Sequence, residues 1–177
     1  MSTIEVNTIK PISGSSTITL GESGDTIALA SGASQTLAAN TPAFLVKKSS
    51  NQTVTSGATT FITWDNEVYD TNTAFDNNRF TVPSGHAGKY LIYCQIHLTG
   101  NSANDYFMNE MFVNNVLTQY NIARFAGAGG LSNLIVVTLD LSVGDYVTIK
   151  VLHNTGSNEE VDYNKLTWFG GYKLIGA

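Results

Sequence analysis

Residues 64–90, WDNEVYDTNTAFDNNRFTVPSGHAGKY, are the stretch that decides the fold. Turn-forming Asn, Asp, Ser and Gly residues separate its large aromatic side chains, among them Trp64, Phe75, Phe80 and Tyr90. Short apolar runs between such turns are typical of β-strands, and no helical period of 3.6 residues is evident in the chain. We therefore expect these aromatic residues to fill the core between two packed sheets.

Apolar and polar residues alternate repeatedly on the C-terminal side of residue 42, and this alternation predicts a series of short strands. Turn residues separate the strands, as at Pro83-Ser-Gly85 and Asn114-Asn115. So many short strands predict an all-β sandwich or jelly roll of two antiparallel sheets. The expected strands are 43–48, 60–69, 78–82, 89–99, 106–113, 116–122, 131–141, 146–154 and 166–175.

Composition and charge exclude several classes of protein. The net charge is -5, the pI is about 5.0 and only 13% of the residues are charged. No basic stripe is present that could neutralise phosphates, so we expect no nucleic-acid partner. The apolar runs have the length of strands, so we expect no insertion into a membrane. The first residues lack the regions of a secretory signal, and we expect no export by that route.

Cys94 is the only cysteine of the chain, so it can form no intrachain disulfide. It lies within an apolar strand pattern, which predicts a buried and unreactive thiol. The stability of the protein must therefore come from packing and assembly.

Residues 7–33 contain a nine-residue repeat: Asn7-Thr-Ile-Lys-Pro-Ile-Ser-Gly-Ser, Ser16-Thr-Ile-Thr-Leu-Gly-Glu-Ser-Gly and Asp25-Thr-Ile-Ala-Leu-Ala-Ser-Gly-Ala. Repeats this short cannot bury an apolar face within one chain. We therefore expect residues 1–41 to form a short β-shaft in which three chains share one core, and residues 42–177 to form a head. The alternative is a disordered linker rich in Ser, Gly and Thr. The apolar columns of the shaft are Ile9, Ile18 and Ile27, with Leu20 and Leu29.

Four segments resemble, in the same order, the sequence of C1q-like domains. Pro42-Ala-Phe44 resembles the opening strand, and residues 64–90 keep the family spacing at Trp64, Asp70 and Phe75. The other two segments resemble the Leu-x-x-Gly-Asp-x-Val turn and the closing strand: Leu141-Ser-Val-Gly-Asp-Tyr-Val147 and Trp168-Phe-Gly-Gly-Tyr-Lys-Leu174. The chain departs from the family in the spacing of Phe80 and Gly88-Lys-Tyr90, and in Ile92 and Cys94, which stand where aromatic residues are usual.

The resemblance implies a jelly roll of the C1q and tumour-necrosis-factor type that assembles as a homotrimer. It names no ligand, because fold and function are separate questions. The residues that it implies as determinants of the fold or the trimer are Phe44, Trp64, Phe75, Phe80, Tyr90, Gly144, Asp145, Phe169, Gly171 and Tyr172.

No catalytic motif is evident, so we expect a protein that is not an enzyme. His86 lies in a turn, and the best interpretation of His97 and His153 is solvent-facing positions on strands. No His pair has the spacing of metal ligands, and no nucleophile elbow is present.

Acidic residues cluster at Asp65, Glu67, Asp70 and Asp76, and we interpret them as parts of solvated loops. We expect no cofactor, with calcium as the alternative. Asp70, Asn72 and Asp76 could supply the oxygen donors that calcium prefers, and some C1q-like trimers hold this ion.

Aromatic residues near Asn-rich and Gly-rich loops are candidates for contacts with a glycan, because a ring face can stack on a sugar while amides bind its hydroxyl groups. The alternative is a place in the core or in a trimer interface. These candidates are Tyr106, Phe107, Tyr120, Phe125 and Tyr163.

A repetitive β-shaft followed by a C1q-like head resembles tail-fibre proteins of bacterial viruses. We therefore expect a homotrimeric virion protein, made in the host cytoplasm, whose head binds a bacterial surface glycan or protein receptor. Its N-terminal segment would contact other virion proteins. The alternatives are a structural virion component that decorates or connects, and a tailspike that degrades polysaccharide.

Overall fold

The computed structural model describes residues 41–100, 105–127, 129–163 and 165–174, together with Gly24, Thr26 and Ser31. The chain divides into two units, Met1–Leu37 and Ala38–Ala177, and the strands of the described residues lie in the second unit. The predicted domain boundary at Pro42 stays a prediction. The predicted shaft columns lie outside the described residues: Ile9, Ile18, Leu20, Ile27 and Leu29.

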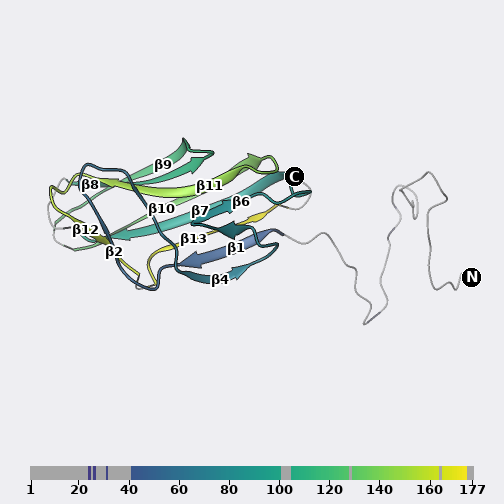
Figure 1. Ribbon diagram of the computed structural model, residues 1–177, viewed down its shortest axis with the longest axis horizontal. Helices are drawn as coiled ribbons and strands as arrows, with labels where there is room; N and C mark the ends of the chain where they lie inside the picture. The colour runs from purple at the N-terminus through teal and green to yellow at the C-terminus, as the bar shows by residue number, and fades with distance from the viewer. Residues whose placement is uncertain are drawn as a thin grey trace, which may run out of the picture. The chain divides into compact units, whose positions relative to one another are not determined.

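The described residues form two antiparallel sheets and contain no helix, which confirms the all-β prediction (Figure 1). No helix among them is long and apolar enough to span a membrane. Sheet A has seven strands: β1 (Ala43–Lys47), β2 (Gln52–Val54), β4 (Asn66–Asp70), β7 (Gly88–Leu98), β10 (Leu131–Leu141), β12 (Glu159–Val161) and β13 (Trp168–Lys173). Sheet B has six: β3 (Thr60–Phe61), β5 (Phe75–Asp76), β6 (Arg79–Thr81), β8 (Tyr106–Val113), β9 (Val116–Arg124) and β11 (Tyr146–His153).

The order of the strands places β10 and β4 at opposite sides of sheet A. Its main ladder runs β10, β7, β13, β1, β4, while β12 and β2 continue from the end of β7. Sheet B runs β5, β6, β11, β8, β9, and β3 also pairs with β11. The side chain of Asn121 on β9 donates to the carbonyl of Leu134 on β10 (3.0 Å), so the two sheets meet along this edge.

The predicted ranges 106–113 and 131–141 are confirmed as β8 and β10. The prediction of one strand over residues 60–69 is wrong, because the chain leaves sheet B after β3 and enters sheet A at β4. At the crossing, the backbone N–H of Trp64 donates to the side chain of Asn78 (2.6 Å) instead of to a neighbouring strand. Strands β2, β5 and β12 were missed because two or three residues are too few to show an alternation.

Aromatic rings from both sheets meet in the core. Phe44 of sheet A stacks on Phe80 of sheet B, with ring centroids 4.8 Å apart and ring planes 7° apart. Phe75 lies 5.5 Å from Phe44, and Phe169 meets the same ring edge-on at 4.9 Å. Trp64 packs on Phe169 at 5.6 Å. These residues and Tyr90 are buried, so their predicted role in the core is confirmed.

The Gly-Asp turn between β10 and β11 also forms as predicted. Gly144 has a φ of +85°, which favours glycine. The carboxylate of Asp145 accepts hydrogen bonds from the side chain of Asn114 and from the N–H of Ser142, both at 2.7 Å. These bonds hold the pKa of Asp145 below its ordinary value.

Cys94 and His153 are both buried in the head. Cys94 is fully buried, as predicted, and burial raises the pKa of its thiol. The solvent-facing interpretation of His153 is wrong, because this residue has no exposed surface. Its ring is bonded to the carbonyl of Val54 (3.2 Å) and to the hydroxyl of Thr155 (3.1 Å), which supply the polar partners that burial requires.

Replacing Phe44 with Ala should lower the free energy of unfolding by about 3–5 kcal/mol, because it removes a fully buried ring that contacts three others. Urea unfolding followed by fluorescence measures the change. Val143→Ala is the control, since Val143 is 51% exposed in a turn and should change the same quantity by less than about 0.5 kcal/mol. Equal effects of the two variants would contradict the assigned core.

Candidate functional site

The outer face of sheet A carries a group of apolar and aromatic side chains, although an antiparallel sheet face that meets water is usually polar. Lys47, Gln95 and Thr138 lie on the same face. On β7, the buried residues alternate with outward-facing Leu91 and Tyr93. The same face carries apolar or aromatic side chains from every strand of the main ladder. We call this set the apolar face, and its residues are Leu45, Tyr69, Leu91, Tyr93, Leu134, Val136, Trp168 and Tyr172.

The strand register makes the apolar face continuous. Val136 on β10 pairs with Tyr93 on β7, and Tyr93 pairs with Gly170 on β13. Gly170 then pairs with Leu45 on β1, which pairs with Tyr69 on β4. Paired residues of an antiparallel sheet share a face, so one row of residues crosses all five strands, and the Tyr93 ring covers its glycine, Gly170.

Tyr93 is at the centre of this face. Its ring meets Trp168 at a centroid distance of 5.5 Å and covers Gly170, where a Cβ atom would lie only 2.6 Å from the ring. Burial raises the pKa of Tyr93 to about 12, and a hydrogen bond with Tyr69 and the nearby Tyr172 act in the same direction. The aromatic rings thus form one packed cluster on the outside of the sheet.

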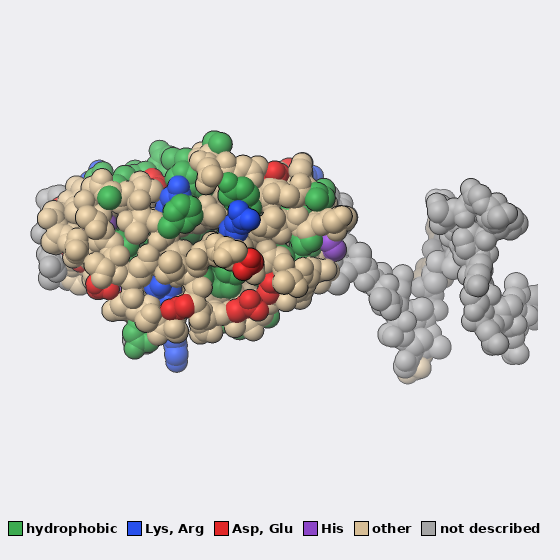
Figure 2. Space-filling view, viewed as in Figure 1, with side chains coloured by type: hydrophobic (Ala, Val, Ile, Leu, Met, Phe, Trp, Pro, Cys, Tyr) green, Lys and Arg blue, Asp and Glu red, His purple; other side chains and the backbone are tan. Residues whose placement is uncertain are grey.

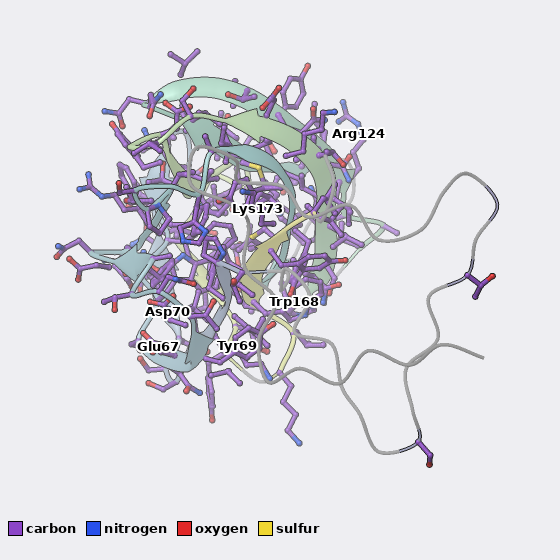
Figure 3. All side chains as sticks on the ribbon, turned by 90° about the vertical axis from the view of Figure 1, so that its right-hand side faces the viewer. Glu67, Tyr69, Asp70, Arg124, Trp168 and Lys173 are labelled. Carbon is purple, nitrogen blue, oxygen red and sulfur yellow. The ribbon has the colours of Figure 1, made fainter. Side chains whose placement is uncertain are left out.

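Strand β9 is exposed along almost its whole length, on both of its faces. Val116 is 66% exposed and Tyr120 is 50% exposed, and Leu117 and Ile122 are also exposed. Figure 2 shows hydrophobic side chains along the edge where Figure 1 places β9. In Figure 3, Arg124 at the end of β9 lies on the opposite side of the sandwich from Tyr69 and Trp168. The head therefore carries a second apolar surface away from these rings.

A depression of about 330 Å³ lies where edge strand β4 of sheet A approaches edge strand β5 of sheet B. We call it the acidic depression. Figure 2 shows acidic side chains over this part of the molecule. The depression brings together Asp65, Glu67 and Asp76, which the sequence placed only in a loose acidic group. Its complete lining is Val46, Trp64, Asp65, Glu67, Phe75, Asp76, Asn77 and Asn78.

Local turn geometry positions one wall of this acidic depression. Asn77 and Asn78 have φ values of +50° and +61°, the left-handed conformation of a two-residue hairpin turn between β5 and β6. The side chain of Asn78 accepts the N–H of Trp64, which ties the turn to the segment that precedes β4. The Asn-Asn pair between short apolar runs is the sequence signal that could have predicted this turn.

Hydrogen bonds also fix Asp65 at the acidic depression. Its carboxylate accepts from the N–H of Ser49 (2.5 Å) and the hydroxyl of Ser50 (3.1 Å). Partial burial raises its pKa, but these bonds and the Lys48 ammonium outweigh that effect and hold the pKa below its ordinary value. Asp65 therefore stays ionised at neutral pH.

Asp70 and Asp76, two of the residues proposed for calcium, accept hydrogen bonds within their own loops. Asp70 uses both carboxylate oxygens to accept the N–H groups of Ala74 and Phe75, each at 3.0 Å. Asp76 accepts from the side chain of Asn77, and Asn72 lies in the turn after β4. Within the described ranges, no group of three or more His, Cys, Asp or Glu residues is placed to hold a metal ion. The set Asp70, Asn72 and Asp76 thus shapes loops.

The predicted glycan-contact residues divide into three groups by burial. Phe107 and Phe125 are buried and pack on each other at 5.9 Å, so their prediction as glycan contacts is wrong and the alternative of a place in the core holds. Their apolar rings close one end of the core. Tyr120 and Tyr163 are about half exposed, on β9 and in the loop after β12. Tyr106 is partly buried beneath the guanidinium of Arg124.

Comparison with known proteins supports the fold. No protein-family model matches the chain, and no curated protein sequence matches it. Among solved structures, the globular domain of zebrafish complement 1qA protein is similar, with a TM-score of 0.56. The match covers 76% of this chain and 98% of that chain, at 16% identity. The predicted C1q-like sandwich of two antiparallel sheets is therefore confirmed.

We expect the melting temperature to be the same in millimolar calcium as in excess chelator, because Asp70 has no oxygen without a backbone partner. Thermal unfolding followed by fluorescence in the two buffers measures this. A melting temperature several degrees higher in calcium, lost in Asp70→Asn, would support the calcium alternative.

Proposed function

We propose that this chain is a trimeric attachment protein of a bacterial virus, and that its C-terminal head binds a glycan on the bacterial surface. The observation that carries the proposal is the apolar face of sheet A, because a monomer would leave that face in water. The repeated Thr-Ile units in residues 7–33 add support, since a shaft of such short repeats needs several chains to bury its apolar columns.

Two unlike apolar surfaces on one head favour a closed ring. A ring of three subunits uses a heterologous contact, in which one surface of each subunit meets a different surface of the next. The apolar face and the exposed edge strand β9 are two such surfaces. Their contact would bury Tyr93 and Val136 from one subunit against Val116 or Leu117 from its neighbour.

The surface that such a ring would leave free is polar, and this suits a glycan receptor. The exposed ring of Tyr163 and the acidic depression offer groups that stack on sugars or bind hydroxyl groups. Three equivalent sites in a trimer would give strong binding to a repetitive polysaccharide even if each site binds weakly.

Size-exclusion chromatography with light scattering should give about three times the chain mass of 19.0 kDa. Val136→Asp should reduce this to the mass of a monomer, because it places a carboxylate in an apolar interface. The matched control is Val143→Asp, at a similarly exposed position in the β10–β11 turn, which should remain a trimer. A wild-type monomer at micromolar concentration would refute the trimer.

The full-length protein should bind one group of bacterial surface glycans on an array, and the Val136→Asp monomer should bind the same group at least tenfold more weakly. The loss follows because the monomer has one site where the trimer has three. Absence of binding to any bacterial glycan would contradict the receptor-binding proposal. Release of reducing ends from the bound polysaccharide would instead support a hydrolase.

A further inference from the structure

We infer that the outer face of sheet B binds an acidic glycan, one that carries carboxylate or phosphate groups. This inference rests on the proposed function and names both the charge of the receptor and the surface that would hold it. In the proposed ring, the outer face of sheet A and the edge strand β9 are covered, while the outer side of β3, β6 and β11 stays exposed. We call the site the cationic face, and its residues are Phe61, Arg79, Phe112, Tyr146 and Lys150.

The strand register brings two cations together on this face. Ile149 of β11 is buried, so its neighbour Lys150 points outward, as does Tyr146 four residues earlier. Tyr146 pairs with Thr81 on β6, and Arg79, two residues from Thr81, therefore lies on the same face. The spacing of strands and residues in a sheet puts the Cα atoms of Arg79 and Lys150 about 8 Å apart.

Aromatic rings hold both cations in place. The guanidinium carbon of Arg79 lies 4.9 Å from the centre of the Tyr146 ring. The ammonium of Lys150 lies 4.0 Å from the centre of the Phe112 ring and 4.5 Å from that of Phe61. Such contacts orient a cation without removing its charge, so an anionic ligand would meet groups that are already ordered. Figure 2 shows Lys and Arg side chains beside hydrophobic ones over the part of the head where Figure 1 places β6 and β11.

The two acidic neighbours of these cations do not pair with them. Glu110 lies opposite Lys150 in the sheet, and Asp76 lies opposite Arg79. Asp76 accepts from the side chain of Asn77 and lines the acidic depression. Glu110 is only 5% exposed, and burial raises its pKa, an effect that Lys150 opposes. Within the part of the chain that the structure describes, neither carboxylate forms an ion pair with its cationic neighbour, so both cations can pair with a ligand.

The charge of the whole chain restricts where an acidic ligand can bind. The net charge is -5, so most of the surface repels an acidic polymer. The acidic depression repels it too and suits only neutral sugars. Complementary charge is thus offered where Arg79 and Lys150 lie together.

The ring of Phe61 and the number of cations favour a glycan over other acidic polymers. Phe61 is 46% exposed beside Lys150, so the apolar side of a sugar ring can pack on it while an acidic group meets the ammonium. Duplex DNA carries one charge per about 1.7 Å and is bound by many cations. Two cations per subunit suit a polysaccharide with one acidic sugar in each repeating unit, and a trimer would contact three such units.

Biolayer interferometry with the full-length protein tests the inference. The immobilised probes are polygalacturonate, poly(glycerol phosphate) teichoic acid, neutral dextran, polyglutamate and single-stranded DNA. At least one of the first two should bind at least tenfold more tightly than the other three probes. Raising NaCl from about 50 to about 500 mM should weaken this binding at least tenfold, because salt screens exposed charges. Stronger binding to polygalacturonate identifies a carboxylate as the bound group, and stronger binding to teichoic acid identifies a phosphate.

The variant Arg79→Gln with Lys150→Gln should weaken that binding at least tenfold, because it removes both charges and keeps polar side chains of moderate length. Arg79→Lys with Lys150→Arg keeps the charges and should bind within about threefold of the wild type. Lys89→Gln is the control for loss of a single charge, an exposed lysine on β7 of sheet A, and it should bind as the wild type does. Light scattering and the melting temperature check that each variant keeps its assembly and fold.

The inference is overturned if neither acidic glycan binds more tightly than dextran, or if the variant without the two charges binds as the wild type does. Equally tight binding of polyglutamate or DNA would also overturn it, because the site would then recognise charge without a sugar.

The glycan array separates this inference from the proposed function. If the array glycans that bind are all neutral, the head is an attachment protein whose site lies elsewhere. If an acidic probe binds at the cationic face while no bacterial glycan is bound on the array, the cationic face is a site for acidic sugars and the proposed function fails.

Discussion

The stacking of Phe44 on Phe80 joins the two sheets, and the rest of the structure depends on it. Phe44 comes from β1 near one side of sheet A, and Phe80 comes from β6 near one side of sheet B. Their contact brings these sides together and leaves β4 and β5 flanking one opening. The same aromatic cluster holds Trp64 against Phe169 at that opening. Core packing and the geometry of the depression are therefore parts of one arrangement.

The side chains that face the core also determine which side chains face outward. Strand periodicity places Ile92 and Cys94 in the core, so Leu91 and Tyr93 must face outward. The Tyr93 ring covers Gly170 so closely that a Cβ atom there would lie 2.6 Å from it. This aromatic cluster on the outer face of sheet A would be buried by contact with another subunit. That burial is the physical basis for the proposed assembly.

Much of the fold could be predicted from the sequence because the long strands carry a clear alternation and the core carries large rings. The ranges of β8 and β10 and the burial of Phe44 and Trp64 followed directly. Other features depend on tertiary structure that no local pattern shows. The crossing between sheets at residues 62–65 and the burial of Phe107 beneath its neighbours are of this kind. The acidic depression was missed for the same reason, since β4 and β5 come together only when the sandwich closes.

A bulge on β4 lets this one strand serve two surfaces. Leu45 pairs with Tyr69 and Val46 pairs with Glu67, so Val68 is an extra residue in the ladder. Without it, Glu67 and Tyr69 would share a face, because they are two residues apart. With it, Tyr69 pairs with outward-facing Leu45, while Glu67 pairs with buried Val46 and lines the depression. Covering the apolar face with a neighbouring subunit would therefore leave Glu67 on the other side of its strand, exposed to solvent.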